Sequence, residues 1–276
     1  MSQRLTRKQT TIVIGIPMFI GALSLALYSW AGPVALVAPP VLIGIFVAFL
    51  IVELRHYQMG LFIRELRETQ AVYAQTEAVL SLVWTLDPKM PFPATRGWAA
   101  SPDLLREILR QVMAEPPALV VEASSGTSTL VIAYALERLG KGKVVALEHE
   151  QFFAEKTRSL IDEHGLSHRA TVVHAPLVET QVDGKKHLWY DLSRAELGTG
   201  IDLLVVDGPP DTTQHLARYP AVPLLKEKFA PGARVLLDDG ARPDERLTAE
   251  RWTQEYGATS CEYLELEKGA WLLRYR

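Results

Sequence analysis

A single cysteine, Cys261, is present in the sequence, so no disulfide bond can form within the chain. This scarcity is typical of proteins from a reducing compartment. Cys261 lies in a segment (259–267) that we interpret as a strand, where a small core residue is expected rather than a nucleophile. Basic residues are not in excess, because 29 Lys and Arg stand against 32 Asp and Glu. The resulting net charge of -3 gives no support for a nucleic-acid partner, which requires a basic surface.

Charged side chains are absent between Lys8 and Glu53. Two apolar runs, 11–30 and 34–54, occupy this interval, and each has the length of about 20 residues that crosses a bilayer core. A signal peptide does not explain both runs, since the second follows the first at once. Two consecutive uncharged runs of this length also disfavour a buried core hairpin. We therefore predict a transmembrane helical hairpin over 11–54, with the membrane as a partner of the chain.

Basic residues flank this hairpin on both sides and are missing from the turn between its spans. The positive-inside rule then places the N-terminal segment (1–10) and everything after the hairpin in the cytoplasm. The flanking residues are Arg4, Arg7, Lys8, Arg55, Arg64 and Arg67. We expect a multi-pass membrane protein with a cytoplasmic C-terminal domain. The segment 55–100 is predicted to form a juxtamembrane helix and then a proline-rich linker.

From Ser101 to Arg276, short β-branched runs alternate with helical segments, which predicts an α/β fold with a parallel sheet covered on both faces. After a first helix at Ser101, the expected helices are 127–139, 151–164, 212–229 and 244–256. The expected strands are 118–123, 143–148, 170–175, 201–207 and 233–239. Two further strands, 260–267 and 270–276, are predicted to close the sheet as an antiparallel hairpin. The sheet then has seven strands.

The first of these strands ends at an acidic residue, Glu122, and a turn of small residues follows it. Small side chains let a ligand approach the main chain closely, and the helix beginning near Thr127 or Ser128 presents free N–H groups to it. The turn consists of Ala123, Ser124, Ser125 and Gly126. It lacks the glycines of a dinucleotide fingerprint and the lysine of a P-loop, which disfavours NAD and FAD.

A second acidic residue, Glu148, ends the next strand about 20 positions beyond Gly126, the usual offset of a ribose-binding carboxylate. A carboxylate there can accept hydrogen bonds from both hydroxyls of a ribose. Adenosine without a diphosphate, next to an acid at the end of the first strand, points to S-adenosylmethionine. His149, His174 and Ala175 follow the second and third strands and are candidates for the adenine edge of the site.

The segment 101–276 resembles class I S-adenosylmethionine-dependent methyltransferases, and most closely the bacterial group that includes O-methyltransferases. The resemblance rests on four motifs in order: VVEASSGTST, VVALEHE, IDLLVVDGPPD and VLLDDG. It implies a Rossmann-like seven-stranded sheet and methyl transfer to a small acceptor, most often at oxygen. The predicted membrane anchor, which lies outside the resemblance, suggests a lipid-linked acceptor. The implied cofactor-binding residues are Glu122, Ala123, Ser124, Ser125, Gly126, Ser128, Glu148, His149, His174, Ala175 and Asp207. Ser124 stands where the family has its middle glycine, and the acidic residue that many members carry after the third strand is missing.

Three aspartates, Asp207, Asp238 and Asp239, match the positions that hold a divalent cation in the metal-dependent members of this family. The resemblance thus implies a site for Mg²⁺, Mn²⁺ or Ca²⁺, which would activate an acceptor hydroxyl. The alternative is that these aspartates only end strands and cap helices. Without a cation, Asp207, Asp239 or His215 is the candidate catalytic base, although methyl transfer depends mainly on alignment.

Two other functions stay open at this point. Ser124 and the missing acid favour a degenerate cofactor-binding module that serves as a membrane scaffold. An NAD or nucleotide-sugar enzyme would also place a carboxylate at Glu148.

Overall fold

The computed structural model describes residues 11–95, 97 and 99–276, and the chain divides into two compact units, Met1–Gln70 and Ala71–Arg276. The predicted cytoplasmic N-terminus, 1–10, lies outside the described residues. The second unit begins at Ala71, well ahead of the domain start that the sequence suggested at Ser101.

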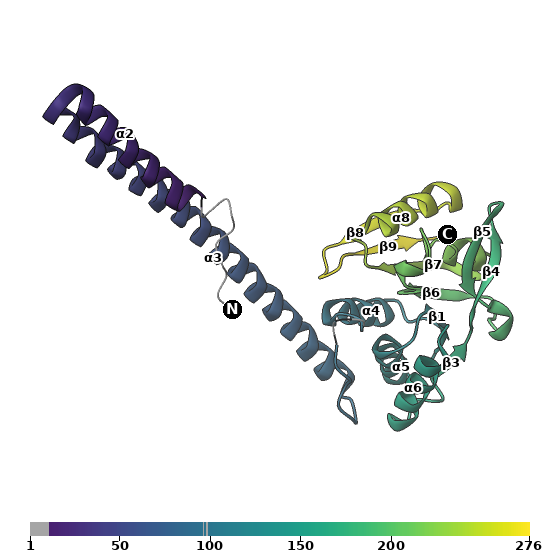
Figure 1. Cartoon of the computed structure of the whole chain (residues 1–276). Helices are drawn as coiled ribbons and strands as arrows, with labels where there is room; N and C mark the ends of the chain where they lie inside the picture. The colour runs from purple at the N-terminus through teal and green to yellow at the C-terminus, as the bar shows by residue number, and fades with distance from the viewer. Residues whose placement is uncertain (1–10, 96, 98) are drawn as a thin grey trace. The chain divides into compact units, whose positions relative to one another are not determined.

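The first unit consists of apolar helical segments (Figure 1). They are a π-helical turn η1 (Thr11–Gly15), α2 (Ile16–Ala31), a 3-10 turn η2 (Gly32–Val37) and the first part of α3 (Ala38–Leu86). Large apolar side chains lie exposed along both helices, among them Phe19, Leu25, Trp30 and Ile45. Thr11–Ala31 and Pro39–Leu86 are long and apolar enough to cross a membrane, on the criterion of length and composition alone.

Helix α3 is one continuous element that covers both the expected second span and the helix expected to leave the membrane after it. Pro39 and Pro40 lie in its first turn, where the missing N–H groups cost no intrahelical hydrogen bond. The end of α3 belongs to the second unit, where Leu82 and Leu86 are 2% exposed and join the hydrophobic core.

The second unit is built on a seven-stranded sheet with the order β3-β2-β1-β6-β7-β9-β8 (Figure 1). Its strands are β1 (Leu119–Ala123), β2 (Lys143–Glu148), β3 (Ala170–His174), β6 (Ile201–Val206), β7 (Phe229–Asp238), β8 (Ser260–Leu264) and β9 (Ala270–Arg274). The first five are parallel, and β9 runs antiparallel to both β7 and β8. The predicted α/β class, the seven strands and the closing hairpin are confirmed.

Helices cover both faces of this sheet because successive side chains of each buried strand point to opposite sides. Val120 joins one core cluster with residues of α4 and α5, whereas Val121 joins the other cluster with residues of α7 and α8. The helices are α4 (Pro102–Ala114), α5 (Thr127–Leu139), α6 (Gln151–Glu163), α7 (Ala221–Leu225) and α8 (Pro243–Tyr256). The core therefore has two layers, one on each side of the strands.

Two local predictions were wrong. The helix expected over 212–229 reduces to α7, flanked by the 3-10 turns η4 (Asp211–Thr213) and η5 (Lys226–Lys228), because Pro220 and Pro223 interrupt the segment. A hairpin of β4 (Leu177–Val182) and β5 (Lys185–Tyr190) had not been expected, and the short η3 (Leu192–Arg194) follows it. Its turn is Asp183-Gly184, with both residues at positive φ, which is a strong hairpin signal.

A buried arginine joins α4 to the sheet. Arg234 of β7 is 2% exposed, and its guanidinium donates to the carbonyl oxygens of Gln111 (2.5 Å) and Glu115 (2.7 Å) at the end of α4. The last carbonyls of a helix have no intrahelical partner, and a cation is favourable there. Arg234 thus satisfies the end of α4 through its two Nη groups, whereas its buried Nε has no hydrogen-bond partner among the described residues.

Replacement of this residue by Arg234→Met should lower the melting temperature of the full chain in detergent. Loss of these charge-assisted hydrogen bonds costs about 2–3 kcal/mol, which corresponds to roughly 5–10 °C for a domain of this size. Tryptophan fluorescence during heating measures the shift. Arg274→Met is the matched control, since Arg274 contacts Glu115 at 2.7 Å on the surface and should contribute under about 1 kcal/mol. Equal shifts in the two variants would contradict this assignment.

Candidate cofactor site

The loop between β1 and α5 makes a sharp turn at the carboxyl edge of the sheet, the edge where α/β folds bind ligands. Ser124 has φ 124° and Gly126 has φ 154°, both in the region that favours glycine. The Ser124 N–H donates to the carbonyl oxygen of Leu147 at 3.0 Å, which ties the turn to β2. The serine that replaces the family's middle glycine therefore keeps a glycine-like backbone, at the cost of local strain.

Glu122, near the end of β1, is completely buried. Its Oε2 accepts a hydrogen bond from the Thr129 hydroxyl at 2.6 Å, and the same hydroxyl accepts from the Gly126 N–H at 3.0 Å. Burial raises the pKa of Glu122 to about 7, although hydrogen bonds from Ser128 and Thr129 act in the opposite direction. Glu122 thus holds the turn and the start of α5 in place, and Thr129 is a site residue that the sequence reasoning missed.

Glu148 ends β2, and its carboxylate is surrounded by donors. Its Oε2 lies 3.1 Å from the Ser125 hydroxyl, its Oε1 accepts from the Glu150 N–H at 3.1 Å, and Nδ1 of His149 lies 3.1 Å from Oε1. Burial acts to raise the pKa of Glu148, but the contacts with His149 and the Glu150 N–H lower it below its usual value. The carboxylate is therefore ionised at neutral pH, as acceptance of two ribose hydroxyls requires.

The Glu148 contact with His149 also raises the pKa of the imidazole, against the effect of burial. The remaining adenine-edge candidates lie one strand further along the edge. His174 is paired in register with Glu148, and the Ala175 N–H donates to the Glu148 carbonyl oxygen at 2.7 Å. The fold thus brings these three predicted residues next to Glu148, and their contact with a cofactor stays a prediction.

A cleft of about 540 Å³ adjoins the turn. One wall is the stretch Ser124–Ser128, and the opposite wall comes from α6, with Phe153, Lys156 and Thr157. Asp207 and the segment around Pro93 complete the lining. The Thr157 hydroxyl lies 3.1 Å from that of Ser125, so α6 contacts the cofactor turn directly. The α6 residues carry no motif, and the sequence reasoning missed them.

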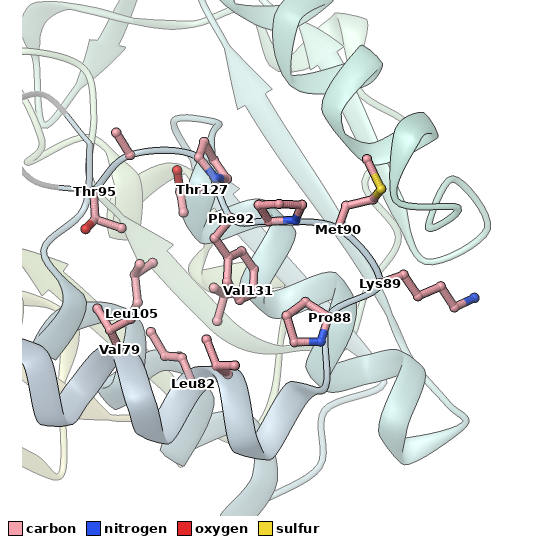
Figure 2. Close-up of a pocket in the computed structure, with 14 residues that line it drawn as sticks. Val79, Leu82, Pro88, Lys89, Met90, Phe92, Thr95, Leu105, Thr127 and Val131 are labelled. Carbon is pink, nitrogen blue, oxygen red and sulfur yellow. The ribbon is translucent and has the colours of Figure 1, made fainter.

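A second cavity of about 530 Å³ has a mainly apolar lining (Figure 2). The end of α3 contributes Val79, Leu82 and Val83. The proline-rich segment after α3 forms another side and includes Met90 and Phe92, as Figure 2 shows. Pro93, Ala94 and Thr127 line both cavities, so the apolar cavity adjoins the cleft.

The three predicted aspartates gather beyond the ends of β6 and β7. One carboxylate oxygen from each of Asp207, Asp238 and Asp239 lies within 4.8 Å of those of the other two. Burial, and after it the neighbouring carboxylates of Asp207 and Asp239, raise the pKa of Asp238 to about 8. Burial also raises the pKa of Asp207, against the effect of Arg218. The three aspartates therefore lie together, as the sequence predicts.

An arginine that the sequence reasoning missed lies among these aspartates. Nη2 of Arg218 is 2.7 Å from Asp239 Oδ2 and 3.4 Å from Asp207 Oδ1, and the side chain is 4% exposed. A divalent cation needs its carboxylate oxygens at about 2.0–2.6 Å and free of competing donors. With Arg218 in this position, the donor set does not fit such a cation.

The described contacts of His215, a predicted catalytic base, do not include any of these three aspartates. Its Nδ1 lies 2.9 Å from Asp244 Oδ2 at the start of α8, and its side chain is 73% exposed. Asp207 and Asp239 thus lie together, whereas His215 pairs with a surface carboxylate.

Tyr190 is a further residue at this edge. It ends β5, is 2% exposed, and lies so close to the loop after β6 that a Cβ on Gly208 would be 2.4 Å from its hydroxyl. Its ring meets that of His149 edge-on, with centroids 6.0 Å apart. The unexpected hairpin therefore closes the carboxyl edge of the sheet beside Glu148.

Comparison with known proteins gives a family match for the centre of this unit. Residues 123–240 match the model of the methyltransferase domain, a range that contains Glu148 and the three aspartates. No curated protein matches the sequence.

Solved structures with the same fold include an S-adenosylhomocysteine-bound methyltransferase of Podospora anserina, which is 14% identical with a TM-score of 0.56 over 77% of this chain and 96% of that one. The O-methyltransferase TomG of Streptomyces achromogenes, in complex with S-adenosylmethionine, is 18% identical with a TM-score of 0.49 over 73% and 88%. An O-methyltransferase of Bacillus cereus is 17% identical with a TM-score of 0.48 over 74% and 91%. Residues 123–240 are therefore similar to the methyltransferase domain, within a unit that has the class I methyltransferase fold.

Proposed function

We propose that this chain is a membrane-anchored methyltransferase that uses S-adenosylmethionine and transfers the methyl group to an oxygen of a small or lipid-linked acceptor. The observation that carries the proposal is the ionised carboxylate of Glu148 beside the strained turn at Ser124 and Gly126. The turn lines a cleft of about 540 Å³, Glu148 lies 3.1 Å from the Ser125 hydroxyl of that lining, and the methyltransferase-domain match spans these residues.

In this arrangement Glu148 binds the two ribose hydroxyls, and the main chain of the turn lies against the methionine part of the cofactor. The acceptor oxygen attacks the methyl carbon in line, the bond from carbon to sulfur breaks, and S-adenosylhomocysteine leaves. Alignment and exclusion of water supply most of the rate. Asp207, which lines the cleft, takes the acceptor proton in this proposal, whereas His215 pairs with Asp244.

The apolar cavity supports an acceptor with a hydrocarbon part, because it adjoins the cleft and its walls are mostly apolar. The two apolar helices support a membrane anchor, with both ends on the cytoplasmic side by the positive-inside rule. A membrane-bound acceptor would account for both features, because the helices would hold the enzyme at the membrane and the cavity would bind the hydrocarbon part of the acceptor.

Cofactor binding tests the central step. Glu148→Ala should weaken S-adenosylmethionine binding by roughly 10- to 100-fold, because charge-assisted hydrogen bonds to the ribose are worth about 1.5–3 kcal/mol. Isothermal titration calorimetry on the full chain in detergent measures the change. Glu150→Ala is the matched control, since the Glu150 side chain is 56% exposed and two positions away. Equal affinities of the Glu148 variant and the wild type would contradict the assigned ribose site.

Turnover is tested by release of S-adenosylhomocysteine when the full chain is mixed with extracts. We expect release with a membrane lipid extract and much less with a soluble one. Tight cofactor binding without release in either extract would instead favour the scaffold.

A bulky residue in the apolar cavity should then separate acceptor binding from cofactor binding. Val79→Trp should raise the KM for the active lipid fraction at least about fivefold, since the indole fills space that the acceptor needs. Val72→Trp, an exposed position of α3 outside the cavity lining, is the control. An unchanged KM in the Val79 variant would show that the acceptor binds elsewhere.

A further inference from the structure

Three neighbouring loop ends bring four carboxyl groups together next to the cleft. Asp207 follows β6, Asp238 and Asp239 end β7, and Glu245 lies in the first turn of α8. Asp238, Asp239 and Glu245 are each at most 5% exposed. Water screens such a group of buried acids poorly, so each of them must either be protonated or lie beside a positive charge.

Arg218 supplies that charge from inside the fold. Its Nη2 donates to Asp239 Oδ2 at 2.7 Å and to the carbonyl oxygen of Asp207 at 3.0 Å. Its Nη1 donates to the carbonyl oxygen of Asp238 at 2.9 Å, and its Nε lies 3.8 Å from Glu245 Oε1. One guanidinium therefore contacts the end of each element that contributes an acid.

The chain holds this arginine in a fixed place. The Leu216 N–H donates to Asp244 Oδ2 at 2.9 Å, and Leu216 itself is at φ 53°. On the other side of Arg218, the Tyr219 carbonyl oxygen accepts from the indole of Trp252 at 2.9 Å. These contacts with α8 leave the guanidinium little freedom to withdraw from the acids.

We propose that the Arg218 guanidinium acts in place of a divalent cation, as the positioning residue that orients Asp207 toward the acceptor, so that this enzyme works without metal. The role of Arg218 in orienting Asp207 rests on the proposed methyl transfer, whereas its exclusion of a divalent cation does not. Arg218 binds the carbonyl and the carboxylate of Asp207, which lines the cleft, and Asp239 Oδ2 accepts from the same Nη2 of the guanidinium. A planar fork of fixed donors fits this set of oxygens, where a lysine ammonium would reach fewer of them.

Binding of Mn²⁺, followed by electron paramagnetic resonance on the purified full chain in detergent after treatment with a chelator, tests the proposal without any acceptor. The wild type should bind no Mn²⁺ at this site. Arg218→Ala removes the internal cation and should bind one Mn²⁺, with a Kd at least about tenfold below the highest Mn²⁺ concentration at which the wild type shows no binding. Arg242→Ala is the matched control, because Arg242 Nη1 also lies 3.1 Å from Asp239 Oδ2 but the Arg218 guanidinium stays in place.

Stoichiometric Mn²⁺ binding by the wild type that Asp238→Asn abolishes would overturn the proposal, and this result does not depend on whether the Arg218 variant folds.

Turnover of S-adenosylmethionine is a second measurement. The wild-type rate should be unchanged by the chelator, whereas the Arg218→Ala rate should fall at least about tenfold and recover in part when Mn²⁺ is added or with Arg218→Lys. A wild-type rate that a chelator abolishes would also overturn it. Failure of S-adenosylmethionine to bind in calorimetry would refute the proposed function and leave the Mn²⁺ result valid.

Discussion

Crowding of acidic groups at one edge is the constraint on which this structure depends. The parallel register of β1, β2, β6 and β7 brings their carboxyl ends to the same edge, and each of these strands ends at or beside an acid. Each acid is accommodated differently. The buried carboxylate of Glu122 accepts from a threonine hydroxyl. The carboxylate of Glu148 contacts Ser125, His149 and the Glu150 N–H, and the aspartates contact Arg218. These arrangements fix the loops, so the geometry of the cleft follows from charge compensation.

The Ser125 hydroxyl connects two parts of this edge. It lies 3.1 Å from both Glu148 Oε2 and Thr157 Oγ1, and so stands between the cofactor turn, the proposed ribose acid and α6. A ribose that takes the carboxylate of Glu148 competes with Ser125 for the same oxygen. In the proposed binding mode, cofactor binding and the packing of the turn on α6 are therefore linked through the Ser125 hydroxyl.

Much of the fold could be predicted because local signals were strong. Helix α5 has the bounds that the sequence indicated, with glycines at Gly126 and Gly140, and β2 also ends where expected. The site acids could be placed from their positions at strand ends. Arg218 could not, because its partners lie 11 and 21 residues away in the chain and meet it only in the folded protein. The turn of the β4–β5 hairpin has a recognisable sequence, Asp183-Gly184, but the expectation that helices connect the strands left the hairpin unpredicted.

The last turns of α3 also determine which fragments of this chain can exist as soluble proteins. Gln75 accepts from the Asp103 N–H at 3.1 Å, and Leu82 and Leu86 are built into the core beside α4. A protease cut or a truncation at the proline-rich segment would remove these side chains and expose an apolar surface on α4 and α5. A fragment that starts near Ala71 keeps these side chains and covers that face.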